Sequence, residues 1–271
     1  MGDEKIGFIG AGNMANALIK GLINSERYQT EQLTAYDIDT EKRKKTETDY
    51  GIKTSQSNRD LVVDCQIILL AIKPQVIRDV LEEVKDLINN EHLIISIAAG
   101  IPIRMISSLI GGDIPIIRVM PNTPALIQKG ISALSGSEIV SSEHLGIARG
   151  IFDAVGETLI VEEKMMDAVT AISGSGPGFI FRIMECFMEA GIKLGFDEDS
   201  CLALVIQTFA GAVRLAEQSE QSVSQLREMV TSPGGTTTAG LTFMEKKGLD
   251  AVIQGGIEAA WNRSVELGKN D

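Results

Sequence analysis

Short apolar runs alternate with helical patterns along residues 1–163 of the chain. The strand-like runs are residues 6–9, 33–36, 64–72, 93–99, 116–120, 130–134 and 157–161. A continuous run such as 64–72 is typical of a strand that is covered on both faces, as in parallel sheets. At least six strands that alternate with helices predict a mostly parallel, doubly wound α/β sheet.

The pattern changes at about residue 164, where long helical periodicities rich in alanine, methionine and leucine replace the strand-like runs. Expected helices cover residues 165–172, 179–194, 197–217 and 222–230, followed by two more that end near Leu267. The sequence therefore predicts an α/β domain at residues 1–163 and an all-helical domain at residues 164–271. These helices are more apolar than a small bundle requires, so we expect part of their surface to meet another subunit.

A glycine-rich turn, Gly10-Ala11-Gly12-Asn13-Met14-Ala15, joins the first strand to the first helix. Gly10 permits a tight turn, and Gly12 lets the backbone approach a pyrophosphate because it has no Cβ. The unpaired N–H groups at the start of the helix then face the phosphates. An ordinary tight turn also matches this spacing, but strand, glycine turn and helix in this order predict a Rossmann-like, dinucleotide-binding domain.

Asp37 directly follows the second strand. An acid at this place usually binds the adenosine ribose hydroxyls and favours NAD. Two alternatives stay open. Asp37 could cap the next helix, although Asp39 or Thr40 could fill that role instead, and Lys42 or Arg43 could meet a 2′-phosphate. The sequence favours NAD(H).

Two later strands end in proline-containing turns, Ala71-Ile72-Lys73-Pro74 and Pro121-Asn122-Thr123-Pro124. Proline cannot continue a central strand, so each turn lies at the carboxyl edge of the sheet, where ligands bind in this class of fold. Ala71 and Lys73 are therefore candidates for the cofactor side. The two prolines fix a rigid loop that presents Asn122 and Thr123.

Two glycine-rich stretches interrupt the helical domain, SGSGPG at residues 173–178 and TSPGGTTTAG at residues 231–240. The second forms a helix start without Cβ atoms at Gly234 and Gly235, beside threonine hydroxyls. Its free N–H groups are suited to a carboxylate. A plain helix break with Ser/Thr capping is the alternative for each stretch. Two such loops beside a dinucleotide fold favour a substrate pocket.

Composition excludes several classes of partner. The net charge is −12, which disfavours nucleic acid and anionic membranes. No apolar run approaches the ~20 residues of a membrane span, and the N-terminus lacks signal-peptide features, which predicts a cytoplasmic protein. The three cysteines show no metal-ligand spacing, and their odd number suits a reducing compartment. The two histidines lack an obvious partner, so neither metal nor histidine-based chemistry is expected.

The motifs GFIGAGNMA, AIKP, RVMPNTP, SGSGP and SPGGTT, in this order, resemble the pyrroline-5-carboxylate reductase family over nearly the whole chain. The later motifs are more specific than GxGxxA, which many dehydrogenases share. The resemblance implies NAD(P)H as cofactor and Δ1-pyrroline-5-carboxylate as substrate. It also implies a homodimer through the helical domain, sometimes built into a larger ring such as a decamer.

The residue pattern and the resemblance together give the candidate site. Cofactor-binding candidates are Gly10, Gly12, Asn13, Met14, Asp37, Asn58, Ala71, Lys73, Pro74, Asn122 and Thr123. Candidates for the substrate carboxylate are Ser232, Gly234, Gly235 and Thr236, and Thr237 is the expected catalytic residue, bonded to the ring nitrogen. Two positions depart from the family: Gly178-Phe179 replaces the usual Ala-Tyr, and Asp37 replaces Ser, Thr or Asn-Arg, which puts NADP use in doubt.

Two other functions remain possible from the sequence. A β-hydroxyacid dehydrogenase has a similar plan but needs a catalytic lysine in the second domain. Lys164 and Lys193 are the lysines near suitable helices, and a surface position suits both better. A non-catalytic dinucleotide sensor would need no second anion site, so SPGGTTT argues against it.

Overall fold

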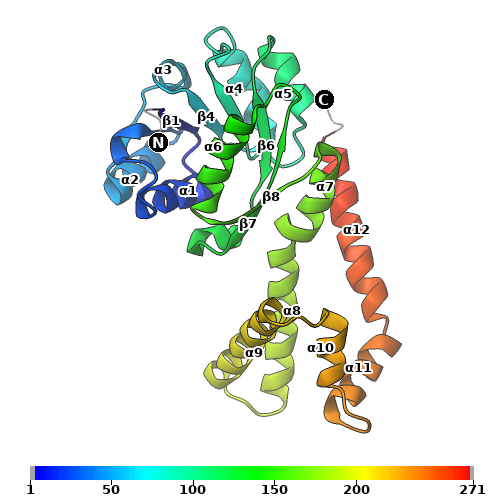
Figure 1. Cartoon of the computed structure of the whole chain (residues 1–271). Coiled ribbons are helices and arrows are strands. Elements are labelled where there is room, and N and C mark those ends of the chain that lie inside the picture. Colours follow the sequence, from blue (N-terminus) through cyan, green and yellow to red (C-terminus); the bar gives the residue numbers. More distant parts are fainter. Residues whose placement is uncertain (1–3, 269–271) are drawn as a thin grey trace. The chain divides into compact units, whose positions relative to one another are not determined.

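Eight strands form one sheet in the computed structural model, which describes residues 4–268 (Figure 1). The strands are β1 (Ile6–Ile9), β2 (Leu33–Tyr36), β3 (Lys53–Thr54), β4 (Ile67–Leu70), β5 (Leu93–Ser96), β6 (Ile116–Met120), β7 (Gly130–Gly136) and β8 (Gly156–Ile160). Their order is β3-β2-β1-β4-β5-β6-β7-β8, and β6–β7 is the antiparallel pair. The predicted mostly parallel sheet is confirmed.

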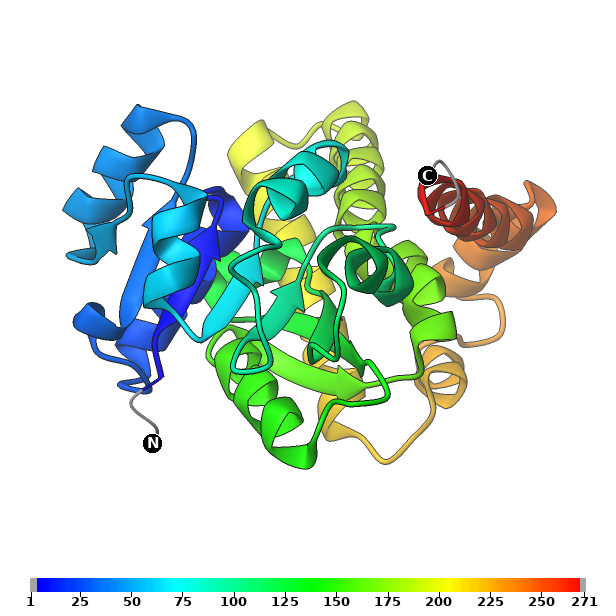
Figure 2. The same ribbon diagram turned by 90° about the horizontal axis from the view of Figure 1, so that it is seen from above.

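Helices cover both faces of this sheet. Alternate strand residues point to opposite sides, and because both sets are apolar in the central strands, both faces must be buried. Ile6 and Phe8 pack in one apolar layer with α1 (Asn13–Asn24) and α6 (Ser142–Asp153). Ile9 packs in the other layer with α3 (Asn58–Asp64), α4 (Ile77–Val84) and α5 (Ile103–Ile110). Figure 2 shows α6 on the opposite side of the sheet from α4 and α5. The polar helix α2 (Thr40–Tyr50) follows β2. The fold is therefore doubly wound.

The remaining helices are α7 (Met166–Val169), α8 (Gly176–Lys193), α9 (Glu198–Gln218), α10 (Val223–Met229), α11 (Thr236–Lys246) and α12 (Leu249–Leu267). A π-helical turn, Thr170–Gly174, follows α7. By compactness the chain divides into Met1–Ser175 with Ala260–Asp271, and Gly176–Ala259. The second unit is helical, as expected. The domain limits 1–163 and 164–271 stay a prediction, because compactness does not show which segment works as a domain.

The second unit exposes many large apolar side chains, among them Phe181, Ile206 and Phe243. Within the described residues, α9 has the length and composition of a membrane span, which differs from the expectation that no part of the chain approaches one. One such helix is weak evidence for a membrane, because an apolar helix that contacts another protein passes the same test. The exposed surface agrees with the expected subunit contact.

The buried Arg118 of β6 forms ion pairs with two acidic residues that follow β8 in the chain. The Arg118 side chain is 7% exposed and lies 3.5 Å from Glu163 and 3.5 Å from Asp167. Ser264 of α12 donates to Asp167 at 2.8 Å. Glu163 also accepts from the main-chain N–H of Ile103 at 2.6 Å, so it holds the start of α5. One cluster thus joins β6, α5, α7 and the end of α12.

We expect Arg118→Met to lower the free energy of unfolding by about 2 kcal/mol. Removing one member of a buried ion pair leaves its partners unpaired, and the partial exposure of Glu163 and Asp167 moderates the effect. Urea unfolding measures it. Arg263→Met is the matched control, because Arg263 pairs with Glu266 on the surface of α12, and a change under about 0.5 kcal/mol is expected there. Equal losses in the two variants would contradict the role of the cluster.

Candidate functional site

The glycine turn after β1 approaches the backbone of the neighbouring strand. Gly10 has φ +103°, and a Cβ there would lie 2.5 Å from the carbonyl oxygen of Ala71. Gly12 has open space where its Cβ would be and is the N-cap of α1, without a side-chain cap. The first N–H groups of α1 therefore face outward at the carboxyl end of β1. This open, uncapped helix start fits a pyrophosphate.

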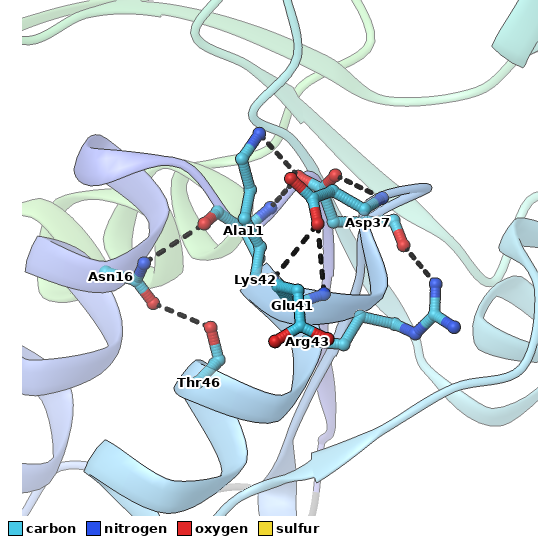
Figure 3. A network of polar contacts seen from close by, with 8 residues as sticks. Ala11, Asn16, Asp37, Glu41, Lys42, Arg43 and Thr46 are labelled. Atoms are coloured by element: carbon cyan, nitrogen blue, oxygen red, sulfur yellow. Dashed lines mark hydrogen bonds and ion pairs between the residues drawn. The ribbon is translucent and has the colours of Figure 1, made fainter.

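Asp37 is tied to this turn. Its Oδ2 accepts from the main-chain N–H of Ala11 at 2.9 Å, and its Oδ1 accepts from that of Asp39 at 3.0 Å (Figure 3). The α2 cap is Asp39, whose side chain accepts from Glu41 and Lys42. Of the three capping candidates, Asp37, Asp39 and Thr40, the N-cap is Asp39, and Asp37 lies beside the glycine turn.

Two basic side chains lie next to Asp37. Lys42 Nζ is 3.7 Å from Asp37 Oδ2. Arg43 donates to the main-chain oxygen of Asp37 at 2.5 Å, and its guanidinium lies 5.3 Å from the centre of the Tyr36 ring. Acid and base are therefore both present where the adenosine ribose binds in this fold.

A chain of hydrogen bonds that no sequence motif indicates supports the glycine turn. Asn16 donates to the carbonyl oxygen of Ala11 at 3.0 Å, and the buried Thr46 donates to Asn16 Oδ1 at 3.0 Å (Figure 3). This chain joins α2 to the turn. Thr46 is the buried residue of the polar helix α2, and no pattern in the sequence distinguishes it from the other polar residues of that helix.

The other cofactor candidates of the first unit lie near the carboxyl edge. Asn13 and Met14 begin α1, and Lys73 and Pro74 follow β4 and Ala71, where a short 3₁₀ helix starts. Asn58 begins α3 and is 8% exposed. Its amide nitrogen donates to Glu83 at 2.8 Å, whereas its Oδ1 is buried without a partner among the described residues. An unpaired buried oxygen is the kind of atom that a ligand hydroxyl satisfies.

Asn122 and Thr123 follow β6 and differ in their surroundings. Asn122 Oδ1 accepts from the main-chain N–H of Ile131 at 3.0 Å, and its Nδ2 donates to Ser173 Oγ at 3.3 Å. Thr123 is exposed and begins a 3₁₀ helix. Thr123 is thus available to a ligand, while Asn122 already contacts two protein groups.

The second unit holds the other glycine-rich loop. Gly235 is the N-cap of α11, again without a side-chain cap, and Gly234 has φ +72°. A Cβ on Gly235 would lie 2.5 Å from Ser232 Oγ, so the hydroxyl crosses close to the helix start. Thr236 and Thr237 are exposed at the first positions of α11. The arrangement is an uncapped N-terminus with hydroxyls beside it, which suits a small anion.

A third threonine stabilises this loop and was not singled out by the sequence. Thr238 donates its hydroxyl to the carbonyl oxygen of Ser232, which also accepts from the N–H of Gly235 at 3.0 Å. The two bonds close the loop on one oxygen.

The lysines considered for dehydrogenase chemistry lie on the surface. Lys164 is 72% exposed and pairs with Glu162, and Lys193 is exposed at the end of α8. Between residues 4 and 268, no three His, Cys, Asp or Glu side chains are grouped to hold a metal ion. The lysines and the possible metal ligands therefore give no further catalytic group for the glycine-rich loops at the starts of α1 and α11.

Comparison with known proteins agrees with the motifs. Residues 163–267 match the family model described as pyrroline-5-carboxylate reductase dimerisation, and residues 5–100 match NADP oxidoreductase coenzyme F420-dependent. Pyrroline-5-carboxylate reductase of Pseudomonas aeruginosa is 39% identical, with 98% of each chain covered. The chain belongs to the pyrroline-5-carboxylate reductase family. The reductase of Methanosarcina acetivorans is 38% identical over 99% of this chain and 100% of its own.

Solved structures of pyrroline-5-carboxylate reductases share the fold. That from Coxiella burnetii has a TM-score of 0.90 at 36% identity, covering 98% of this chain and 99% of its own. That from Plasmodium falciparum, with NADP bound, has a TM-score of 0.91 at 33% identity, covering 99% of both chains. The chain is therefore assigned to this family and not to the β-hydroxyacid dehydrogenases or to non-catalytic dinucleotide sensors. It is an oxidoreductase with a nicotinamide cofactor.

Proposed function

We propose that this chain reduces Δ1-pyrroline-5-carboxylate to L-proline, the reaction of its family, with the substrate carboxylate at the start of α11. The observation that carries this proposal is the uncapped α11 N-terminus, where Thr236 and Thr237 are exposed beside Ser232. Its N–H groups and positive dipole end favour an anion. A carboxylate held there fixes the position of the imine ring.

The cofactor lies along the carboxyl edge of the sheet in this proposal. The α1 N-terminus at Gly12 holds the pyrophosphate, Asp37 binds the adenosine ribose, and the unpaired Oδ1 of Asn58 accepts a hydrogen bond from the same half of the cofactor. Ala71, Lys73, Pro74 and Thr123 flank the other half. When bound, the reduced nicotinamide supplies a hydride.

The reaction requires the protein mainly to orient the substrate and the cofactor. A protonated cyclic imine is already an electrophile, so the residues need to hold the ring carbon in place and to keep water out. The N–H groups of α11 orient the carboxylate. The Thr237 hydroxyl forms a hydrogen bond with the ring nitrogen. The proton stays on this nitrogen while hydride addition to the ring carbon converts the protonated imine to the amine. No strong acid or base is needed, which agrees with the hydroxyl and N–H groups that form the candidate substrate site.

We propose that NADH is preferred to NADPH. The Asp37 carboxylate is 12% exposed and would lie against a 2′-phosphate, which it repels, whereas it accepts hydrogen bonds from ribose hydroxyls. Lys42 is already paired with Asp37, so it offsets part of this repulsion without removing it.

The match to the dimerisation model supports a homodimer through the helical segment. We propose that dimers assemble further into a ring such as a decamer, and that the enzyme is cytoplasmic. Light scattering of the purified protein measures the assembly, with the ring giving a mass well above that of two chains.

The function is tested by following NADH oxidation with pyrroline-5-carboxylate, against NAD reduction with 3-hydroxy acids. The proposal predicts turnover in the first assay and proline as product. Turnover with a hydroxy acid would favour a hydroxyacid dehydrogenase. Tight NADH binding without turnover in either assay would favour a dinucleotide sensor.

We expect Gly235→Ala to raise KM for pyrroline-5-carboxylate about 5- to 10-fold, the value of one hydrogen bond. The new Cβ displaces Ser232 Oγ from the helix start, while KM for NADH stays unchanged. Steady-state kinetics measures both constants. Gly240→Ala, on the same helix with nothing within 4 Å of its Cβ, is the control and should match the native enzyme. An unchanged KM in Gly235→Ala would remove Ser232 from the carboxylate site.

A further inference from the structure

The π-helical turn at Thr170–Gly174 lies against the carboxyl end of β6. Its defining bond runs from the N–H of Ser175 to the carbonyl oxygen of Thr170 at 2.8 Å, five residues back. A Cβ on Gly174 would lie 2.4 Å from Met120 Cε, so the end of the Met120 side chain packs directly on this glycine. Isolated π-turns of this kind often occur at functional sites. Here the turn brings Gly174 of the SGSGP motif to Met120, the last residue of β6.

Asn122 joins this turn to the sheet. Its side chain accepts from the main-chain N–H of Ile131 at 3.0 Å and donates to Ser173 Oγ at 3.3 Å. Both ends of the amide are therefore engaged, one with β7 and one with the π-turn. Each end of an amide can form a second hydrogen bond, but these two bonds fix the position of the Asn122 side chain between β7 and the π-turn.

The position along the sheet indicates which part of the cofactor lies nearby. Asp37 places the adenosine half beside β2, on one side of β1. The nicotinamide half then extends along β4, β5 and β6, on the other side of β1. The carboxyl end of β6, with Asn122 and the π-turn, thus borders the reacting half.

We propose that Asn122 is a positioning residue that acts through Ser173. It holds the π-turn at the carboxyl end of β6, so that the turn forms a fixed wall for the reacting half of the cofactor. The side chain is not itself a cofactor ligand. The inference rests on the proposed function, because it assumes that the nicotinamide reacts at this edge.

Ser173→Ala is the direct test. Removing Ser173 Oγ leaves Ile131 paired with Asn122 but frees the π-turn from the amide. We expect kcat to fall about 5- to 10-fold, with KM for NADH within twofold of native. The primary isotope effect on kcat from C4-deuterated NADH should rise, because a less fixed π-turn positions the nicotinamide less well and slows hydride transfer. A purely structural bond would leave this isotope effect unchanged.

Two further variants separate positioning from direct contact. Asn122→Ala and the Asn122→Ala/Ser173→Ala double variant should show the same kcat, because the two residues act as one unit. Ser173→Thr keeps the hydroxyl and should recover most of the activity. Thr170→Val is the matched control in the same turn, since the Thr170 hydroxyl bonds only to Met166 of its own helix at 2.8 Å, and native kcat is expected.

The proposal is overturned if Ser173→Ala behaves as native while Asn122→Ala loses activity, because Asn122 would then not act through Ser173. It is also overturned if the two losses add in the double variant. The melting temperature of each variant is measured beside its kinetics. If Ser173→Ala proves to be unfolded at the assay temperature, the kcat of Ser173→Thr is the test instead. Failure of the proposed function is distinct, because the native enzyme itself would then not reduce pyrroline-5-carboxylate.

Discussion

Replacing Thr237 by alanine should lower kcat for pyrroline-5-carboxylate reduction about 100-fold, the usual loss for one catalytic hydrogen bond at a site where charge changes. Thr237 is exposed near the start of α11, so its side chain supports no core packing. We therefore expect the melting temperature and the Kd for NADH to stay at native values. Pre-steady-state and steady-state NADH oxidation measure the loss.

Thr242→Ala is the matched control for this prediction. Thr242 is also exposed on α11, beyond the first turn, so it lies away from the free N–H groups. Its loss should leave kcat unchanged. Native turnover in a folded Thr237→Ala enzyme would show that the ring nitrogen finds its partner elsewhere.

Replacing Asp37 by serine should raise the ratio of kcat/KM for NADPH to that for NADH about 50-fold. A nearby unit charge contributes a few kcal/mol to this choice where solvent is partly excluded. The variant removes the carboxylate that faces a 2′-phosphate and releases Lys42, 3.7 Å away, to pair with the phosphate. Serine still accepts one of the main-chain bonds that Asp37 holds. Steady-state rates with both cofactors give the ratio.

Asp39→Ser controls for the loss of one negative charge. Serine is a good N-cap, so α2 keeps its cap, and the cofactor ratio should stay within about twofold of native. A native enzyme that prefers NADPH, or an Asp37→Ser variant with an unchanged ratio, would contradict the role given to Asp37.

The fold followed from the sequence where the signal is local. Residues 67–70 are apolar on both sides of the strand and flanked by a turn, so their burial between two helical layers was predictable. The glycine turn was equally plain, because Gly10 and Gly12 stand between a strand and a helix. The two-residue β3 (Lys53–Thr54) carries too few residues for any pattern.

Features that depend on distant partners could not be predicted in this way. SGSGP suggested a break in the helix, whereas the chain forms a π-turn, because Gly174 packs on Met120 and Ser173 bonds Asn122, about fifty residues earlier. Arg118 lies in an apolar strand, and its acidic partners Glu163 and Asp167 lie beyond β8, so the sequence around Arg118 does not indicate them. By sequence Asp37, Asp39 and Thr40 were all possible caps of α2, and the backbone N–H groups that the two carboxylates face decide between Asp37 and Asp39.

The central claim is that one physical device, an uncapped helix N-terminus, holds an anion in each unit: pyrophosphate at α1 and substrate carboxylate at α11. A crystal structure of the enzyme with NAD⁺ and L-proline tests it most directly. We expect the proline carboxylate on the N–H groups of Thr236 and Thr237, and the proline nitrogen within hydrogen-bond distance of Thr237 Oγ1. A proline carboxylate bound by other groups, with the start of α11 facing solvent, would contradict the account.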